Sequence, residues 1–425
     1  MDTDHLEKVP QEMMDHIITL CDKASLLALR ETSKCIFGMT DNIFISRHFK
    51  KRTHLYAVLG LFSLAEITAS RLGNHIHEIE LVSRSVHMGM AKGEHKLAMW
   101  NGEGAVIAGC GIGEKTLYKI LHDLQHGTCE LTFKLSTGDD SMHPYGAGIR
   151  AKQIEVSNIV DTSKLQSCPG IDCPDMLTAL LGAGLLLSEV NVPNPIRELH
   201  AHYRQHHSHM ESMGFKFTGQ AGLSPTAWDQ LKLLNFDMGD DVHDWSSTEW
   251  KNFKSFLESA PNLESVTLAC TSDSSPGRAS LKSLDALGYA MASCRAKHLE
   301  LGPCDLYESS LIELLCTHMP QLQSLKLVKV SLPYLPEGDG WGKNSCDGSW
   351  NRVLEGVAKK LNLCSIELVD LHKQLFSESW DSLYTFPFAD GEDNRSFSFK
   401  GSKAVREGLE RLVSSGQYLA KERKV

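Results

Sequence analysis

The sequence predicts an α/β protein in which a small module of N-terminal helices precedes an irregular array of parallel strands and helices. Three observations carry this prediction. Apolar residues recur at helical spacing within residues 1–50. A short strand motif recurs along the rest of the chain, and helical stretches precede several of its copies. The chain has 425 residues, which is too long for one simple core unless a repeat array accounts for the length.

Residues 1–50 are expected to form short helices joined by tight turns. Pro10 suits the first turn of a helix, because the N–H that it lacks would be unpaired there anyway. The apolar residues at helical spacing after it are Met13, Met14, Ile17, Ile18 and Cys21. Ser25 and Ser33 are expected to cap the next two helices. Such a small bundle buries little surface, so it needs a partner, either the rest of the chain or another protein.

The order and spacing of these residues resemble the F-box, a helical module that docks on the Skp-type adaptor of SCF ubiquitin ligases. The matching residues are Leu6, Val9, Pro10, Glu12, Ile17, Leu20, Leu26, Leu29, Arg30, Ser33, Lys34 and Phe37. The chain departs mildly from the pattern at Val9, Met13, Met14 and Ser25. The resemblance implies that the adaptor-binding residues are Pro10, Ile17, Leu20, Leu26 and Leu29. Some of these five must pack the module's own core instead.

Beyond residue 50, the recurring motif is an apolar residue followed, three and five positions later, by two more. This is the strand pattern of a leucine-rich repeat. Its clear copies are Ile76-Ile79-Leu81, Leu231-Leu234-Phe236, Leu263-Val266-Leu268, Ala296-Leu299-Leu301, Leu322-Leu325-Leu327 and Leu363-Ile366-Leu368. Weaker copies lie at Leu131-Phe133 and Val190-Val192. Helical stretches that start near Leu117, Trp250, Leu311 and Trp350 precede four of the strands.

The spacing of these copies is irregular, so we expect a degenerate leucine-rich-repeat-like solenoid over residues 51–425, behind an F-box-like three-helix module over residues 1–50. Gly and Pro residues mark a surface insert near residues 331–349. A doubly wound α/β enzyme domain would show a similar alternation, but no nucleotide fingerprint opens it. An F-box start before such an array resembles the large class of fungal F-box proteins with degenerate leucine-rich repeats.

Two segments resemble chemical sites. Residues 106–116 resemble a phosphate-binding loop, but Glu114 stands where the glycine before Lys115 is required, and a carboxylate opposes phosphate binding. In the segment HAHYRQHHSH, His202, His206 and His209 could bind zinc from one face of a helix, although a solvated loop or helix is the favoured interpretation. No catalytic motif is present. We therefore expect that the protein is not an enzyme and that it has no catalytic residue, no metal and no cofactor.

Composition narrows the class of partner. The formal net charge of −10 argues against nucleic-acid binding. The acidic N-terminus lacks the features of a signal peptide, and the apolar stretch 176–192 is too short and too interrupted to span a membrane. The twelve scattered cysteines are expected to be reduced, as in the cytoplasm or the nucleus.

These observations together predict a substrate-recognition adaptor of an SCF-type ubiquitin ligase. The F-box-like module would dock on a Skp-type adaptor, and through it on a cullin-RING ligase. The repeats would bind an unknown target protein on their concave strand face or on the insert, with Tyr334, Trp341 and Trp350 as candidate anchors, although Trp350 is more expected in the core. Such a receptor acts by proximity alone. The alternative is a leucine-rich-repeat scaffold with no ligase role.

Overall fold

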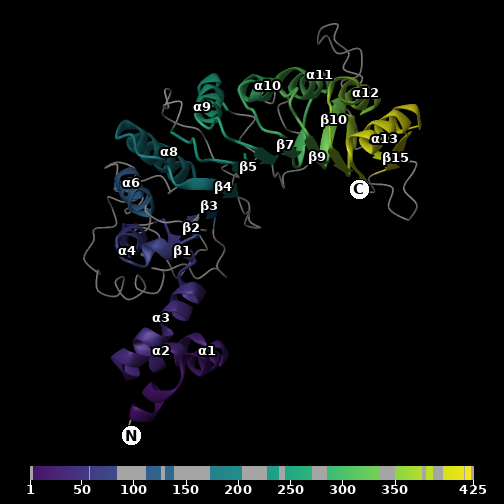
Figure 1. The fold of residues 1–425 in the computed structure, drawn as a ribbon. Coiled ribbons are helices and arrows are strands. Elements are labelled where there is room, and N and C mark those ends of the chain that lie inside the picture. Colours follow the sequence, from purple (N-terminus) through teal and green to yellow (C-terminus); the bar gives the residue numbers. More distant parts are fainter. Residues whose placement is uncertain are drawn as a thin grey trace, which may run out of the picture.

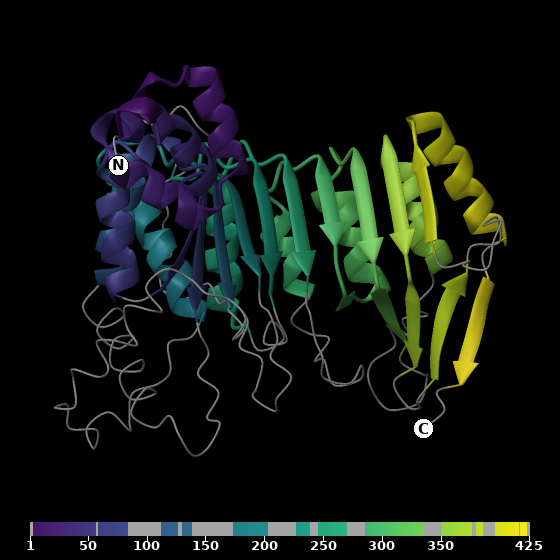
Figure 2. The ribbon, with the colours of Figure 1, turned by 90° about the horizontal axis from the view of Figure 1, so that it is seen from below.

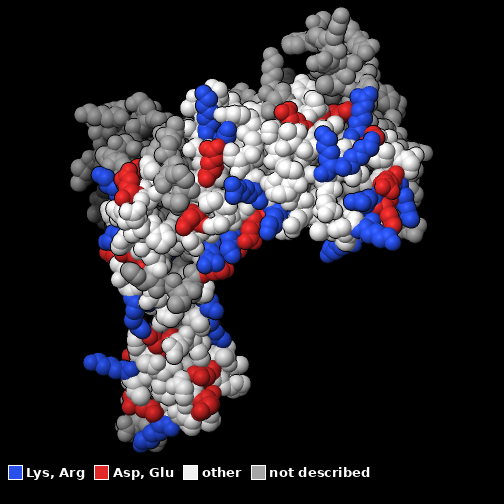
Figure 3. All heavy atoms as spheres, turned by 45° about the horizontal axis from the view of Figure 1, so that its top comes forward, with Lys and Arg blue, Asp and Glu red and all other residues white. Residues whose placement is uncertain are grey.

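A computed structural model gives the fold and confirms the α/β class (Figure 1). The structure describes residues 3–56, 58–83, 112–125, 130–137, 173–202, 227–238, 245–269, 285–334, 350–375, 380–385, 396–415 and 417–422. Helices at the N-terminus project as a lobe from one end of a larger body (Figure 3). That body is built on a ten-stranded sheet and a smaller, five-stranded sheet.

The N-terminal helices are η1 (Thr3–Lys8), α1 (Gln11–Leu20), α2 (Lys23–Thr32) and α3 (Lys34–His48). They pack around a core of their own, formed by Met14, Ile18, Leu26 and Ile36. We call these helices the N-terminal module.

The sequence predicted the N-cap of α3 correctly and that of α2 wrongly. Ser33 caps α3 as predicted, since its Oγ accepts a hydrogen bond from the Ile36 N–H at 3.2 Å. The prediction that Ser25 caps α2 is wrong. The helix begins earlier, at Lys23, and Asp22 accepts the Ser25 N–H at 2.7 Å.

The large sheet follows the order of the chain almost throughout. Its strands are β1 (Lys51–Leu55), β2 (Glu78–Ser83), β3 (Leu131–Thr137), β4 (Ile196–His202), β5 (Leu233–Asp237), β6 (Ser265–Ala269), β7 (His298–Leu301), β9 (Ser324–Val328), β11 (Ser365–Val369) and β14 (Ser396–Lys400). They neighbour one another in that order, and every pair is parallel except β11 with β14. Parallel strands need a crossover between them, and helices supply most of these crossovers.

The helices cover the convex face of this curved sheet, and the strands line the concave face (Figure 1). They are α4 (Val58–Thr68), η2 (Gly73–His75), α6 (Ile112–Leu124), α8 (Cys173–Glu189), α9 (Ser247–Glu258), α10 (Asp285–Met291), α11 (Glu308–Glu313), η5 (Leu314–His318), α12 (Trp350–Lys360) and α13 (Ser402–Ser415). No helix among the described residues is both long enough and apolar enough to cross a membrane.

The recurring apolar motif forms the core between sheet and helices. In the six clear copies, every one of the motif residues is at most 3% exposed. The middle residues lie in register across neighbouring strands, for example Leu234 opposite Val266 and Val266 opposite Leu299. The predicted helix starts at Trp250 and Trp350 also bury their side chains in this core. The motif recurs in the strands because its residues form the face of the sheet that packs against the helices.

The weaker motif at Val190-Val192 is not a strand. These residues follow α8 in a turn, where Asn191 has a φ of 55° and ends the helix. The strand, β4, begins at Ile196. The predicted insert is also partly wrong, since residues 331–334 belong to strand β10, while residues 335–349 lie outside the described residues.

The smaller sheet was not predicted. Its strands are β8 (Cys304–Asp305), β10 (Val330–Tyr334), β12 (His372–Leu375), β13 (Trp380–Thr385) and β15 (Gln417–Glu422), and their order is β15-β13-β12-β10-β8. It lies beyond the carboxyl ends of the last large-sheet strands (Figure 2). Lys329 and Asp370, with φ of 54° and 48°, turn β9 and β11 into β10 and β12.

Candidate functional site: an apolar surface on the N-terminal module

Helix α1 carries apolar side chains on the face that packs in the module core and also on a face that is exposed. Met14 and Ile18 are buried in the module. Met13, Ile17 and Leu20 are 60%, 37% and 78% exposed. Residues three and four apart share a face of a helix, so these three side chains form one stripe. We call Met13, Ile17 and Leu20 the α1 stripe.

Exposed apolar side chains are concentrated in this module. Among the described residues, nine large apolar side chains are exposed, and six of them precede residue 38: Leu6, Met13, Ile17, Leu20, Leu27 and Phe37. The other three lie apart in the body: Phe62 on α4, Val190 in the turn after α8, and Tyr289 on α10. Single exposed apolar residues are ordinary, whereas a concentration of them marks a surface for a partner.

The five residues expected at an adaptor interface divide into three groups. Pro10, Ile17 and Leu20 are exposed. Leu29 is half-buried and packs against the module core. Leu26 is 1% exposed and belongs to that core, so its side chain is not part of the surface. Sequence reasoning left Met13 and Leu27 out of this set, although Met13 stands one helical turn before Ile17.

The C-terminal end of α1, which presents Leu20, is held from α3. The Arg47 guanidinium donates to the backbone carbonyls of Ile18 at 3.0 Å and Thr19 at 2.9 Å. The Ile18 carbonyl also accepts the N–H of the C-cap residue Cys21 at 3.2 Å, and a cation at this end of the helix complements the helix dipole. At the other end, the Gln11 side-chain amide donates to the Met39 carbonyl at 2.9 Å. The stripe is thus displayed on a helix fixed at both ends.

Arg30 of α2 contacts several side chains of α3. Its guanidinium carbon lies 4.0 Å from the centre of the Phe37 ring and 4.1 Å from that of Phe44. It also donates to Thr40 at 3.3 Å and to Asp41 at 2.7 Å, so this buried cation is well satisfied. Arg71 and then Arg30 hold the pKa of Asp41 below its usual value, against the effect of burial.

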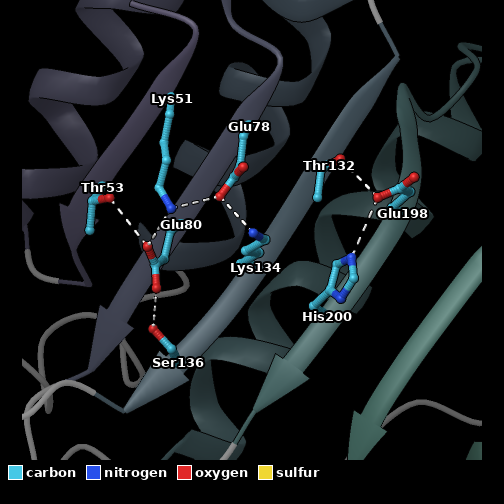
Figure 4. A network of polar contacts seen from close by, with 9 residues as sticks. All are labelled: Lys51, Thr53, Glu78, Glu80, Thr132, Lys134, Ser136, Glu198 and His200. Carbon is cyan, nitrogen blue, oxygen red and sulfur yellow. Dashed lines mark hydrogen bonds and ion pairs between the residues drawn. The ribbon is translucent and has the colours of Figure 1, made fainter. Parts of the chain in front are cut away.

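The concave face of the large sheet is a second candidate surface, and it is polar. Near its N-terminal end, the Glu78 carboxylate lies between Lys51 at 2.9 Å and Lys134 at 2.8 Å (Figure 4). Glu80 accepts from Thr53 at 3.2 Å and from Ser136 at 3.0 Å. These ion pairs and hydrogen bonds connect side chains of three neighbouring strands, β1, β2 and β3.

The ionisation of this face follows from its pairs. Burial raises the pKa of Glu78, but Lys134 and Lys51 outweigh burial and hold the pKa below its usual value. Burial lowers the pKa of His200, against the nearby Glu198 at 3.5 Å. Glu78 is therefore charged and His200 neutral at pH 7.

A similar group lies further along the face, where Lys326 stands 3.1 Å from Glu300 and 3.9 Å from Glu367. Such mutually paired charges fix the register of neighbouring strands and present a hydrogen-bonding surface.

The two segments that resembled chemical sites do not form one among the described residues. Glu114 lies in the first turn of α6, and its side chain packs against Gly182, where a Cβ would come within 2.7 Å of it. Gly113 is buried in α6, while residues 109 and 111 lie outside the described residues. The helix expected from His202 onward does not include His202, which ends strand β4.

The remaining histidines of the predicted zinc site, His206 and His209, lie outside the described residues. Within the described ranges, no group of three or more His, Cys, Asp or Glu side chains could hold a metal ion. Of the candidate anchors for a target, Trp350 is buried in the core, as expected. Tyr334 lies in β10, and Trp341 lies outside the described residues.

Comparison with known proteins assigns no family. No protein-family model matches the chain, and no curated protein matches it.

Proposed function

We propose that this protein is a substrate-recognition adaptor of an SCF-type ubiquitin ligase. The N-terminal module docks on a Skp-type adaptor, and through it on a cullin-RING ligase. The body formed by residues 51–425 holds a target protein. The chain contributes no catalytic group, since a receptor of this kind acts by bringing the target close to the conjugating enzyme.

The α1 stripe is the observation that carries the proposal. Burying a large apolar side chain completely contributes about 1.5–3 kcal/mol. Met13, Ile17 and Leu20 are 60%, 37% and 78% exposed, so together they offer about 3–5 kcal/mol before the costs of association. That contribution is lost while the stripe faces water. The stripe lies in the segment that resembles the F-box, and it includes Ile17 and Leu20 of the residues that the resemblance implies.

We further propose that the body is a degenerate leucine-rich-repeat solenoid. Two observations support this. The strands follow the chain order through the large sheet, and the same apolar motif sits in register in successive strands. In a repeat array each unit contacts its neighbours and none buries its apolar face alone. The polar concave face then supports a target bound through hydrogen bonds and ion pairs.

Calorimetric titration of a purified Skp-type adaptor into the full chain tests the docking proposal. We expect binding by the wild type and a loss of about a hundredfold or more with Leu20→Asp, because the interface would bury an unpaired charge. Phe62→Asp is the matched control. Phe62 is exposed on α4 in the body, so this variant should bind like the wild type.

The same titration separates the alternative. Circular dichroism must first show that both variants fold like the wild type. A folded wild type that does not bind the adaptor would contradict the ligase role. It would leave a leucine-rich-repeat scaffold that binds a partner without a ligase.

A further inference from the structure

The junction between the N-terminal module and the body contains a carboxylate shared by both parts. Asp41 lies on α3 of the module. Its Oδ1 accepts from Arg30 of α2 at 2.7 Å, and its Oδ2 accepts from Arg71 of the body at 2.5 Å. The two oxygens of one carboxylate therefore link a residue of the module to a residue of the body.

The module end of this link is immobile. Arg30 is held between the rings of Phe37 and Phe44 and bonded to Thr40, and its side chain is 7% exposed. A buried guanidinium with its donors in use has little freedom to turn. Asp41 is thus oriented by the module before it meets Arg71.

At the body end of this link, a tight turn sets the backbone. Arg71 lies in the tight turn after α4, where the Gly73 N–H donates to the Ser70 carbonyl at 3.0 Å. A Cβ at Gly73 would come within 2.2 Å of the Thr68 carbonyl oxygen, so the turn requires glycine there. The position of the Arg71 backbone is therefore set by α4.

The hydrophobic contacts do not duplicate this link. The core of the module and the core of the body share no residue. Side chains that pack within separate cores hold each part together, but they do not determine the angle between the two parts. The Arg52 guanidinium also donates to the His48 carbonyl at 3.3 Å, but this contact lies within four residues of the connection between α3 and β1. Arg71 reaches Asp41 from thirty residues away, so the bond to Asp41 adds a restraint on the angle that the connection does not supply.

We propose that Asp41 is a releasable pin that sets the angle between the N-terminal module and the body. The pin is closed when Arg71 and Arg30 both bind the carboxylate. It opens when the bond to Arg71 is lost, because the Arg71 side chain is 61% exposed and salt screens such a pair. This proposal concerns the chain alone and does not depend on the proposed function.

The test is a pulsed electron-spin distance measurement on the full chain. Spin labels are placed through non-natural amino acids at positions 34 and 251, where Lys34 on α3 and Lys251 on α9 are exposed. The wild type should give one narrow distance distribution. Arg71→Gln should widen it about twofold or split it, because a two-state joint without its bond populates both states.

Two comparisons make the result specific. Lys50→Gln removes another exposed cation at the junction and should leave the distribution narrow. Concentrated salt should widen the wild-type distribution but add nothing to Arg71→Gln. The unfolding midpoint followed by tryptophan fluorescence should be unchanged, which shows that the body is intact. A distribution as narrow in Arg71→Gln as in the wild type would overturn the proposal, because the backbone alone would then set the angle.

Discussion

His54 illustrates how one buried side chain couples folding of the body to pH. It lies in β1, is fully buried, and its Nδ1 is 3.1 Å from the Gly60 carbonyl oxygen. Burial, assisted by the charge of Arg52, lowers the pKa of His54 to about 4. The folded state therefore keeps this imidazole neutral at a pH where the unfolded chain protonates it.

The free energy of unfolding should consequently fall as pH drops from the unfolded-state pKa of about 6.5 towards 4, by about 3 kcal/mol in all. The contribution is fully present above that unfolded value. His54→Asn should flatten this part of the pH profile. Urea unfolding at several pH values, followed by tryptophan fluorescence, measures it. Parallel profiles for wild type and variant would show that His54 is not responsible.

Individual side chains on α1 show what the sequence could not decide. Apolar residues stand in adjacent pairs, Met13 with Met14 and Ile17 with Ile18. Helical spacing identifies both members of each pair as apolar, but the packing of α2 and α3 decides which one is buried. For the same reason the sequence did not separate Leu26, in the core, from the exposed Leu20.

At the scale of elements, the start of α2 gives a direct comparison between two cap residues. Asp22 accepts the Ser25 N–H, while Ser25 contributes its backbone and not its side chain to that bond. Asp22→Ala should therefore destabilise the module by about 1 kcal/mol, and Ser25→Ala by only a few tenths. Thermal unfolding followed by circular dichroism measures both. Equal losses, or a larger loss for Ser25→Ala, would contradict the assignment of the cap.

Elements with a strong apolar pattern were predictable, and those without one were not. The strands that contain Val266 and Leu325 follow the motif because their apolar side chains pack in one core against apolar side chains of the helices. Strand β1 was missed, because its sequence KRTHL holds one apolar residue and its buried side is supplied by His54. The smaller sheet was missed because its strands continue from β9 and β11 through turns at Lys329 and Asp370, which no glycine marks.

At the scale of the whole molecule, the module and the body have separate cores, so we expect each part to have its own free energy of unfolding. The buried tryptophans, among them Trp228, Trp250 and Trp350, belong to the core of the body, and residues 1–50 hold no tryptophan. Ile18→Ala leaves a cavity in the module core and should destabilise the module by about 2–5 kcal/mol.

The tryptophan-monitored midpoint of that variant should nevertheless stay where it is in the wild type. Hydrogen exchange of α1 to α3, compared with tryptophan fluorescence in urea, measures the two parts. If Ile18→Ala shifted the fluorescence midpoint as much as it loosened the module, the two cores would be one cooperative unit.

The overall plan of helices followed by a parallel strand–helix array was predictable, because it rests on periodicity along the chain. The junction between the parts was not. The bond of Asp41 to Arg71 joins residues thirty positions apart, and neither residue belongs to a motif that sequence reasoning uses. Polar contacts of this kind depend on the three-dimensional arrangement that the apolar pattern first produces.

Hydrogen exchange of the full chain with and without a Skp-type adaptor measures whether the α1 stripe is the surface that the adaptor covers. We expect slower exchange in Gln11–Leu20 and unchanged exchange in α9, which lies in the body. Unchanged exchange in Gln11–Leu20 under conditions where the adaptor binds, or slower exchange confined to the body, would contradict it.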